Sequence, residues 1–228
     1  FARVAWEIAN DDPDVLVMQD AGVIATHPDE AAPVRAALAG RQLYVEDQYV
    51  VASRYPLEGC APGSLATGEE TTHYVHCTVR VPGHALEVYT AHFLSPREGL
   101  NAARHRERGG LEEWEYNVKI RLAQADLLVK GVAQGQHPLV VAGDLNADEH
   151  SPIVRRLLDL GLRDAWSSST FGYGYTYGHD LAPRFSFLRI DHVLASPEVG
   201  VAGCRTGGRD ASQHRPVICE LRLPATER

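Results

Sequence analysis

The stretch LVVAGDLN, residues 139–146, joins a short apolar run to a polar turn. Four apolar residues followed by a glycine are typical of a buried strand that ends at a turn. Asp144 and Asn146 then follow two residues apart, so a carboxylate and an amide can converge on one point in a cleft. There the carboxylate can polarise a water or hold a metal ion, while the amide steadies the same group. An ordinary turn is the alternative, because Asp and Asn favour turns.

Two later strand ends also carry ionisable groups. In RIDHVL, residues 189–194, the alternation of a strand turns Asp191 to the face opposite both of its neighbours. An aspartate flanked by apolar residues in a buried strand is costly unless it is paired, so a structural ion pair is the alternative to a functional role. His214 precedes Pro216 and a further apolar run, which places its imidazole at the mouth of a strand. A lone histidine in such a place is more often structural.

The composition is typical of a soluble globular protein. At 228 residues the chain can bury one core, and we expect a single domain over residues 1–228. No stretch approaches the roughly 20 apolar residues that cross a bilayer. The formal net charge of -8 argues against a broad basic face that grips long stretches of phosphate backbone, but it does not exclude cleavage of nucleic acid.

Hydrophobic periodicity and turn residues predict more strands than helices. The mixture of hairpins with strand-helix-strand units implies an α+β layered sandwich with mixed sheets. We expect irregular loops at residues 56–68 and 93–112, which are rich in glycine, proline or polar residues. Helices are predicted at 1–10, 29–39, 111–132 and 152–160, and strands at 14–19, 42–46, 49–54, 73–81, 85–92, 139–142, 188–195, 199–206 and 216–223.

The four cysteines stand singly, without the C-x-x-C spacing of zinc ribbons or thioredoxin-like sites. Cys77 and Cys219 lie inside apolar runs, where we expect small buried thiols. One or two disulfides remain open, and the redox compartment is therefore undetermined.

Residues 172–178, GYGYTYG, lack the spacing of a dinucleotide-binding loop. As a loop beside the mouth, the three tyrosines could stack on a base, a sugar or a ring, with a plain surface loop as the alternative. The charged residues 104–108 and Arg97 could steer a phosphate, although a solvated charge run is the better interpretation of the cluster.

Five segments follow one another along the chain: DVLVMQD at 14–20, YTAHF at 89–93, GDLN at 143–146, RIDH at 189–192 and SQHRPV at 212–217. In this order they resemble motifs of the endonuclease/exonuclease/phosphatase superfamily. Residues 95–102, 175–179 and 185–188 carry a finer resemblance, to bacterial proteins of the membrane-anchored type within it.

This resemblance implies a four-layer α/β/β/α sandwich with two mixed β-sheets, as in deoxyribonuclease I, and a divalent-metal-dependent phosphoesterase. Its chemistry is an in-line attack of water on a phosphodiester, helped by Mg²⁺ or Mn²⁺. In these roles Asp144 aligns or deprotonates the water, Asn146 holds it, Asp191 orients His214 on the phosphate, and His92 stabilises the phosphate or the leaving oxygen. Asp20, Asp144 and Asn146 are the expected metal ligands, and Arg97, Asn101, Tyr175 and Tyr177 the expected substrate contacts.

The sequence departs from the family pattern at three places. Asp20 stands where the family has glutamate, and the lost methylene withdraws the carboxylate by roughly 1 Å, an error that can cost on the order of 100-fold in rate. Gln213 stands where the family has aspartate, so it brings no negative charge. The family's first strand, which carries an asparagine, is not found, and the domain over residues 1–228 is expected to lack it.

A catalytically eroded phosphate-binding module and a partner domain of a membrane protein are the alternatives to an active hydrolase. The substrate stays open among nucleic acid, nucleotides, inositol phosphates and phospholipid headgroups, because the fold does not choose among them. A membrane-tethered or extracytoplasmic location through a missing N-terminal segment is an expectation of the finer resemblance.

Overall fold

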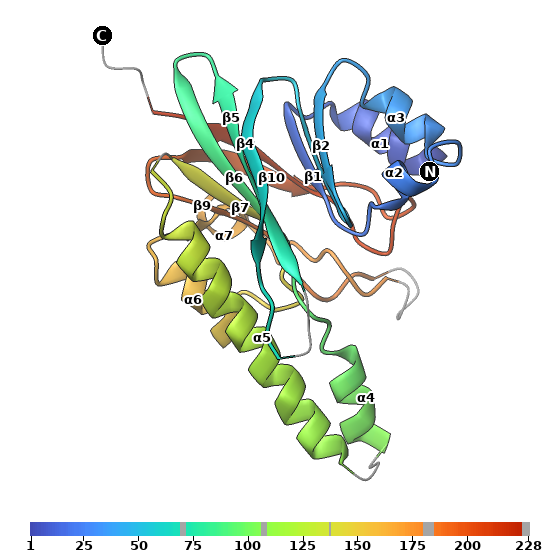
Figure 1. Cartoon of the computed structure of the whole chain (residues 1–228), viewed down its shortest axis with the longest axis vertical. Helices are drawn as coiled ribbons and strands as arrows, with labels where there is room; N and C mark the ends of the chain where they lie inside the picture. Colours follow the sequence, from blue (N-terminus) through green and yellow to red (C-terminus); the bar gives the residue numbers. More distant parts are fainter. Residues whose placement is uncertain (69–71, 106–108, 137, 180–184, 225–228) are drawn as a thin grey trace.

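The computed structural model describes residues 1–68, 72–105, 109–136, 138–179 and 185–224 (Figure 1). The helices are α1 (Ala2–Asp11), α2 (Val23–Thr26), α3 (Ala32–Ala37), α4 (Arg97–His105), α5 (Gly110–Val132), α6 (Pro152–Leu158) and α7 (Ala165–Ser169). The strands are β1 (Val15–Met18), β2 (Gln42–Glu46), β3 (Tyr49–Ser53), β4 (Leu57–Ser64), β5 (His73–Val81), β6 (His84–His92), β7 (Leu139–Asp144), β8 (Arg163–Asp164), β9 (Asp191–Ala195), β10 (Gly200–Thr206) and β11 (Val217–Arg222).

The larger sheet has six strands in the order β4-β5-β6-β7-β9-β8. The pair β6 and β7 is parallel and the other pairs are antiparallel, so the sheet is mixed. A parallel neighbour needs a crossover connection, and α4 and α5 lie in the connection between these two strands. The long helix α5 and the shorter α6 lie on the same side of this sheet (Figure 1).

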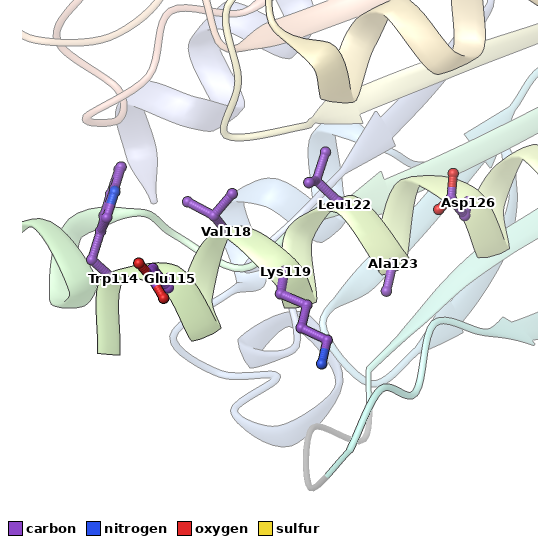
Figure 2. A pocket seen from close by; sticks show the side chains of 7 residues that line it. All are labelled: Trp114, Glu115, Val118, Lys119, Leu122, Ala123 and Asp126. Carbon is purple, nitrogen blue, oxygen red and sulfur yellow. The ribbon is translucent and has the colours of Figure 1, made fainter. Parts of the chain in front are cut away.

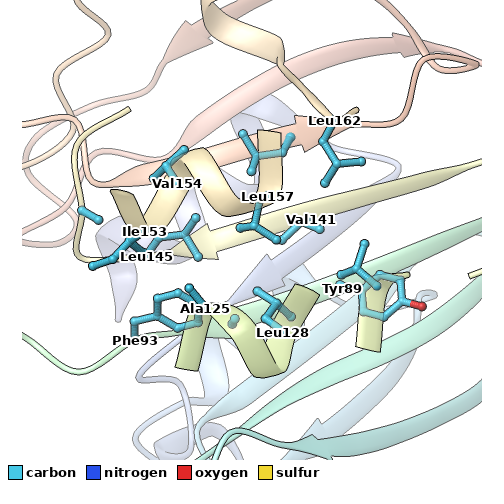
Figure 3. Packing of buried hydrophobic residues seen from close by; sticks show 14 of the residues in the cluster. Tyr89, Phe93, Ala125, Leu128, Val141, Leu145, Ile153, Val154, Leu157 and Leu162 are labelled. Atoms are coloured by element: carbon cyan, nitrogen blue, oxygen red, sulfur yellow. The ribbon is translucent and has the colours of Figure 1, made fainter. Parts of the chain in front are cut away.

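One face of the six-stranded sheet packs on α5 and α6. Tyr89 and Val141, on the two parallel strands, belong to the same buried cluster as Ala125 and Leu128 of α5 (Figure 3). Each fully buried aliphatic side chain of this kind contributes about 1.5–3 kcal/mol relative to exposure. This cluster therefore fixes the parallel strands whose ends carry the predicted site.

The opposite face of the same sheet packs on the smaller sheets. Because side chains alternate along a strand, Val88 and Val140 face away from the helices and join a cluster with Val15 and Val17 of β1 and Leu221 of β11. The outer face of β1 in turn carries residues that pack on α1, α2 and α3. The order of layers is α/β/β/α, which confirms the predicted fold class.

The layer of smaller sheets is in two parts, β1-β3-β2 and β10-β11. A groove of about 500 Å³ lies along β1 and β11, and it continues to the strand ends that carry the site. In the described part of the chain, β1 pairs only with β3 and β11 only with β10, so each keeps one unpaired edge. The groove is lined along its length by Val15, Val17, Leu86, Val88, Val140, Ala142, Val193, Val217, Cys219 and Leu221.

The predicted loop at residues 56–68 is wrong over most of its length, because β4 occupies Leu57–Ser64. Among the described strands β4 pairs only with β5, and its register shifts between Glu58 and Ala61. Proline is tolerated in edge strands and glycine at bulges, and Gly59 has a φ of 58° beside this shift. The residues taken as loop formers are those of an irregular edge strand.

The predicted irregular segment 93–112 contains α4. Gly99 and Gly110 are not helix breakers here but points of close approach between α4 and α5. A Cβ on Gly99 would lie 3.1–3.3 Å from Asn117 and Trp114, and one on Gly110 would lie 2.4 Å from the Ala102 carbonyl oxygen. The short elements α2, α7 and β8 also escaped prediction, because their lengths give no periodicity.

The expectation of buried free thiols is wrong. The cysteines form two disulfides, Cys60–Cys77 between β4 and β5 and Cys204–Cys219 between β10 and β11. Each bond joins neighbouring strands of one hairpin, and such pairings are invisible in a sequence that shows only four separate cysteines.

Reduction of the disulfides should lower the stability of the protein. The bridges span 17 and 15 residues, and closing a loop of about 15 residues stabilises by roughly 3 kcal/mol in the chain-entropy account. Urea unfolding with and without reductant would measure the loss. Titration of four free thiols in the native protein before any reduction would contradict the two bridges.

Candidate active site

Three residues of the site lie side by side across three neighbouring strands. The parallel register pairs His92 of β6 with Asp144 of β7, and the antiparallel register pairs Asp144 with Asp191 of β9. Paired residues of adjacent strands point to the same face of a sheet. The strand ends therefore bring an imidazole and two carboxylates to one edge of the six-stranded sheet.

His214 reaches the same place from the segment before β11. Its Nδ1 lies 2.9 and 3.1 Å from the two carboxylate oxygens of Asp191. Its backbone pairs with Tyr177, whose ring lies 4.7 Å from the imidazole between centroids. The carboxylate and the tyrosine together fix the orientation of the ring.

The Oδ2 atom of Asp144 lies between two imidazoles. It is 3.7 Å from Nε2 of His92 and 3.8 Å from Nε2 of His214. Both separations are too long for a direct hydrogen bond, and the three polar atoms converge on one point, where a water or a phosphate oxygen beside them could contact all three. The other oxygen, Oδ1, accepts a hydrogen bond of 2.8 Å from the backbone N–H of Asn146.

His92 is held from the side of β1 and β3. Its Nδ1 lies 2.7 Å from Oε1 of Gln48 and 3.5 Å from Oδ1 of Asp20, so Gln48 is the nearer partner. Its backbone N–H donates to the hydroxyl of Tyr49, which is fully buried and donates in turn to the carbonyl of His73. The imidazole is thus fixed through both its ring and its backbone.

Burial raises the pKa of Asp144 to about 6, and the nearby charge of Asp191 acts in the same direction. Burial alone would lower the pKa of His214, but the hydrogen bond and charge of Asp191 outweigh it, and the pKa is raised. The pKa of His92 is also raised, because Asp20 and Asp144 outweigh its burial. The hydrogen bond to His92 lowers the pKa of Asp20.

The acidic groups of the site suit a cation. Ligand atoms of Asp144, Asp191 and His214 all lie within 4.8 Å of one another. Asp144 is 7% exposed, and the neighbouring carboxylate raises its pKa, so a positive charge there would relieve an unfavourable crowding. Carboxylate oxygens are the ligands that Mg²⁺ and Mn²⁺ prefer.

A family model for the Endonuclease/Exonuclease/phosphatase family matches residues 2–214. The chain belongs to this family. Its members are hydrolases that act on phosphoesters and generally depend on a divalent metal ion. No curated protein matches the sequence.

Solved structures of the endonuclease/exonuclease/phosphatase family share the fold. One from Beutenbergia cavernae is 22% identical with a TM-score of 0.72, covering 99% of this chain and 66% of that chain, slightly under two thirds. A mannosyl-6-phosphatase from Bacteroides thetaiotaomicron is 17% identical with a TM-score of 0.68, covering 97% of this chain and 90% of that chain. ANGEL2, a 2',3'-cyclic phosphatase in complex with adenosine-2',3'-vanadate, is 15% identical with a TM-score of 0.73, covering 99% and 86%.

The structure brings Asn146 to the site with a left-handed backbone, φ 49°, which asparagine adopts more readily than most residues. Its side-chain amide donates to the carbonyl of Phe93 at 2.8 Å and lies 3.5 Å from Oδ2 of Asp144. Asp20 lies at the rim, with its side chain 81% exposed. Gln213 is exposed and has no hydrogen bond to the cluster among the described residues.

The four predicted substrate contacts separate into two groups. Tyr177 is buried beside His214, and its hydroxyl accepts a hydrogen bond from the guanidinium of Arg97. Tyr175 stacks on Tyr173 in the same loop. Asn101 is exposed on α4, and the described residues show no contact between it and the cluster. Residues 106–108 of the charged cluster lie outside the described residues.

Sequence reasoning missed Gln48, Tyr49, Arg121 and Thr176. The guanidinium of Arg121, on α5, donates to the carbonyl of Asn146 and supports the turn after β7. The hydroxyl of Thr176 accepts from the backbone N–H groups of Ile190 and Asp191, at 3.3 and 3.4 Å. Gln48, Tyr49 and Arg121 belong to none of the segments that carry the resemblance, and Thr176 lies in one of them without a role having been assigned to it. The need of a buried tyrosine hydroxyl for a partner was a usable signal for Tyr49.

A second hollow lies on α5, away from the site. It has a volume of about 440 Å³, and Trp114, Val118 and Leu122 project from one side of the helix toward it (Figure 2). His92, Asp144 and His214 line the groove instead. No helix among the described residues has the length and apolar character to span a membrane.

The raised pKa of Asp144 should make the metal-free protein less stable as pH rises. A carboxyl whose pKa is higher in the folded than in the unfolded protein stabilises the fold at low pH. This contribution is lost as pH rises from about 4 through about 6. The difference is on the order of 3 kcal/mol for about two pKa units. Urea unfolding in EDTA at pH 4.5 and pH 7 should show this loss in the wild type and a smaller one in Asp144→Asn.

Mg²⁺ at pH 7 should recover stability in the wild type and not in Asp144→Asn, because a ligand of the folded state stabilises it. Asp29→Asn, at an exposed site away from the groove, serves as the control and should behave as the wild type. If the free energy of unfolding changed equally with pH in the wild type and in Asp144→Asn, the raised pKa of Asp144 would be contradicted.

Proposed function

We propose that the chain is a divalent-metal-dependent phosphoesterase that hydrolyses a phosphodiester by in-line attack of water. The observation that carries the proposal is the position of Asp144, whose Oδ2 faces Nε2 of both His92 and His214 across gaps of 3.7 and 3.8 Å. A carboxylate and two imidazoles around one small space can hold a water and a phosphate together. Positioning and charge neutralisation supply most of the catalysis in such reactions.

Asp144 would orient the attacking water and accept its proton. In the protein without a bound ion its pKa is raised to about 6, close to the working pH, which suits a general base. Its Oδ1 is fixed by the N–H of Asn146, which leaves Oδ2 for the water.

His214 would contact a phosphate oxygen through Nε2. The Nδ1 contact with Asp191 fixes which nitrogen faces the phosphate and favours the protonated ring. His92, with Gln48 at its Nδ1, would present its own Nε2 to the phosphate or to the leaving oxygen.

A bound Mg²⁺ or Mn²⁺ would polarise a phosphoryl oxygen and neutralise developing charge. We propose Asp144, Asp20 and Asn146 as its ligands, with Asp191 engaged instead by His214. The Asp20 side chain is exposed at the rim of the site. Waters would complete the coordination shell of the ion where this shorter carboxylate does not reach it.

The substrate class is proposed as a phosphoester with a single bound phosphate, such as a nucleotide, an inositol phosphate or a phospholipid headgroup. The net charge of -8 disfavours long contacts with a nucleic-acid backbone. A phosphate-binding module without catalysis is the second candidate, and the shortened Asp20 and the neutral, exposed Gln213 favour it.

Hydrolysis of bis(p-nitrophenyl) phosphate and p-nitrophenyl phosphate should require the metal and Asp144. We expect turnover with Mg²⁺ or Mn²⁺, none with EDTA, and a loss of about 10²–10⁴-fold in Asp144→Asn, the range of general acid–base contributions. Asp191→Asn should lose activity as well, with its pH profile shifted to lower pH, because the raised pKa of His214 depends on that carboxylate.

Asp29→Asn is again the matched control. Turnover that EDTA does not affect, or that survives in Asp144→Asn, would contradict the proposal. Binding of phosphate without turnover of these or natural phosphoesters, in the folded protein, would favour the binding module.

We propose that residues 1–228 lack the first strand of the domain, and the groove along β1 and β11 supports this proposal. We propose that a strand of this domain fills the groove, because both flanking edges are unpaired and apolar side chains line the space between them. In the protein isolated from its natural source, the edge amides of β1 and β11 should then exchange slowly with deuterium. Fast exchange at both edges would contradict a filling strand.

An extracytoplasmic location is likewise proposed. The two disulfides support it, because disulfides persist in oxidising compartments and are rare in reducing ones. Recovery of the native protein with four reduced thiols from its natural source would contradict this location.

A further inference from the structure

Three tyrosines lead from the surface to His214. Tyr177 is 8% exposed, and its ring lies 4.7 Å from that of His214. Tyr175 precedes it by two residues, about 7 Å along an extended chain. The ring of Tyr175 stacks on that of Tyr173 with the centroids 5.0 Å apart and the planes 2° from parallel. The outer ring, Tyr173, is 76% exposed.

The loop that carries these rings is fixed on both sides. Gly174 has a φ of 62° and lies so close to the ring of Trp166 that a Cβ would come within 2.5 Å of it. Trp166 is itself 9% exposed, and its Nε1 donates to the carbonyl of Gly172. A glycine is therefore required here for both its backbone conformation and its close approach.

Thr176 ties the same loop to the strands of the site. It is fully buried, and its hydroxyl accepts from the N–H groups at the start of β9, including that of Asp191. Its carbonyl accepts a hydrogen bond of 2.8 Å from the N–H of Arg215, next to His214. The tyrosines are thus held in place relative to Asp191 and His214 rather than on an independent loop.

Core packing does not explain the outer two rings. A tyrosine that serves the core buries its ring, as Tyr49 does at 0% exposure, whereas Tyr173 is 76% exposed. Phe171 beside it is wholly exposed, so the loop collects aromatic surface outside the core. Exposed aromatic surface next to a polar site is typical of ligand-binding surfaces.

We propose that Tyr173 and Tyr175 form a stacking platform for a planar ring carried by the substrate, such as a nucleobase linked through its sugar to the phosphate at His214. The parallel stack offers a flat face on which a further ring can continue, and stacking tolerates any base because every base has a π-face. Arg97, bonded to the hydroxyl of Tyr177, adds a guanidinium beside the tyrosine that packs on His214. This proposal rests on the proposed phosphoesterase function, since it concerns the substrate of that site.

Equilibrium binding without turnover tests the platform. In the Asp144→Asn background, titration calorimetry compares adenosine 5'-monophosphate with ribose 5-phosphate, which has the same phosphate and sugar but no ring. We expect the nucleotide to bind at least about tenfold more tightly, as base–aromatic stacking predicts. Tyr173→Ala should remove most of this difference and leave ribose 5-phosphate unchanged, while Tyr173→Phe should retain it.

Tyr116→Ala is the matched control, because Tyr116 is another exposed tyrosine, 48% exposed on α5. It should leave both affinities unchanged. Equal affinity for the two ligands, or a nucleotide preference that survives in Tyr173→Ala and Tyr175→Ala, would overturn the platform. A third result would also overturn the platform: the two ligands bind equally well, and the protein cosediments with phosphatidylcholine vesicles unless Tyr173→Ala is present. This result would assign the aromatic loop to a membrane surface. Loss of hydrolysis alone would bear on the proposed function, since this binding test needs no turnover.

Discussion

The register of three strands is the constraint on which the site depends. β7 lies between a parallel neighbour, β6, and an antiparallel one, β9, and only this pairing sets His92, Asp144 and Asp191 side by side. A slip of one residue would turn a whole strand over and send its polar end residue into an apolar layer. The clusters on the two faces of the sheet oppose such a slip, because each accepts only alternate residues of β7. Packing far from the chemistry therefore maintains the geometry of the chemistry.

Much of this arrangement could be predicted from the sequence because its signals are local. The apolar run before Asp144, the alternation around Asp191 and the position of His214 before a strand each appear within a few residues, and together with the family resemblance they give the layers and the centre of the site. The family resemblance implied that Asp191 orients His214, and their side chains lie 2.9 Å apart. Asn101 shows the limit of the resemblance, because its exposed place on α4 carries no contact with the cluster in the described chain.

What the sequence could not show depends on contacts between distant segments. Gln48 contacts His92 across 44 residues, and Arg121 supports the Asn146 turn from the middle of a helix. The disulfide pairing and α4 were not predicted for the same reason, since strand pairing sets the first and a close helix contact at Gly99 allows the second. Local propensity has no information about such partners.

The balance of charge differs among the three carboxylates of the site. Asp191 is satisfied by His214, and Asp20 interacts with His92, but Asp144 is buried between two imidazoles without a direct hydrogen bond to either. Its raised pKa is the measure of this deficit. A cation or a bound water removes the deficit, and both are reactants or cofactors of phosphoester hydrolysis. The buried carboxylate of Asp144, with its raised pKa, is therefore well placed to act on a substrate.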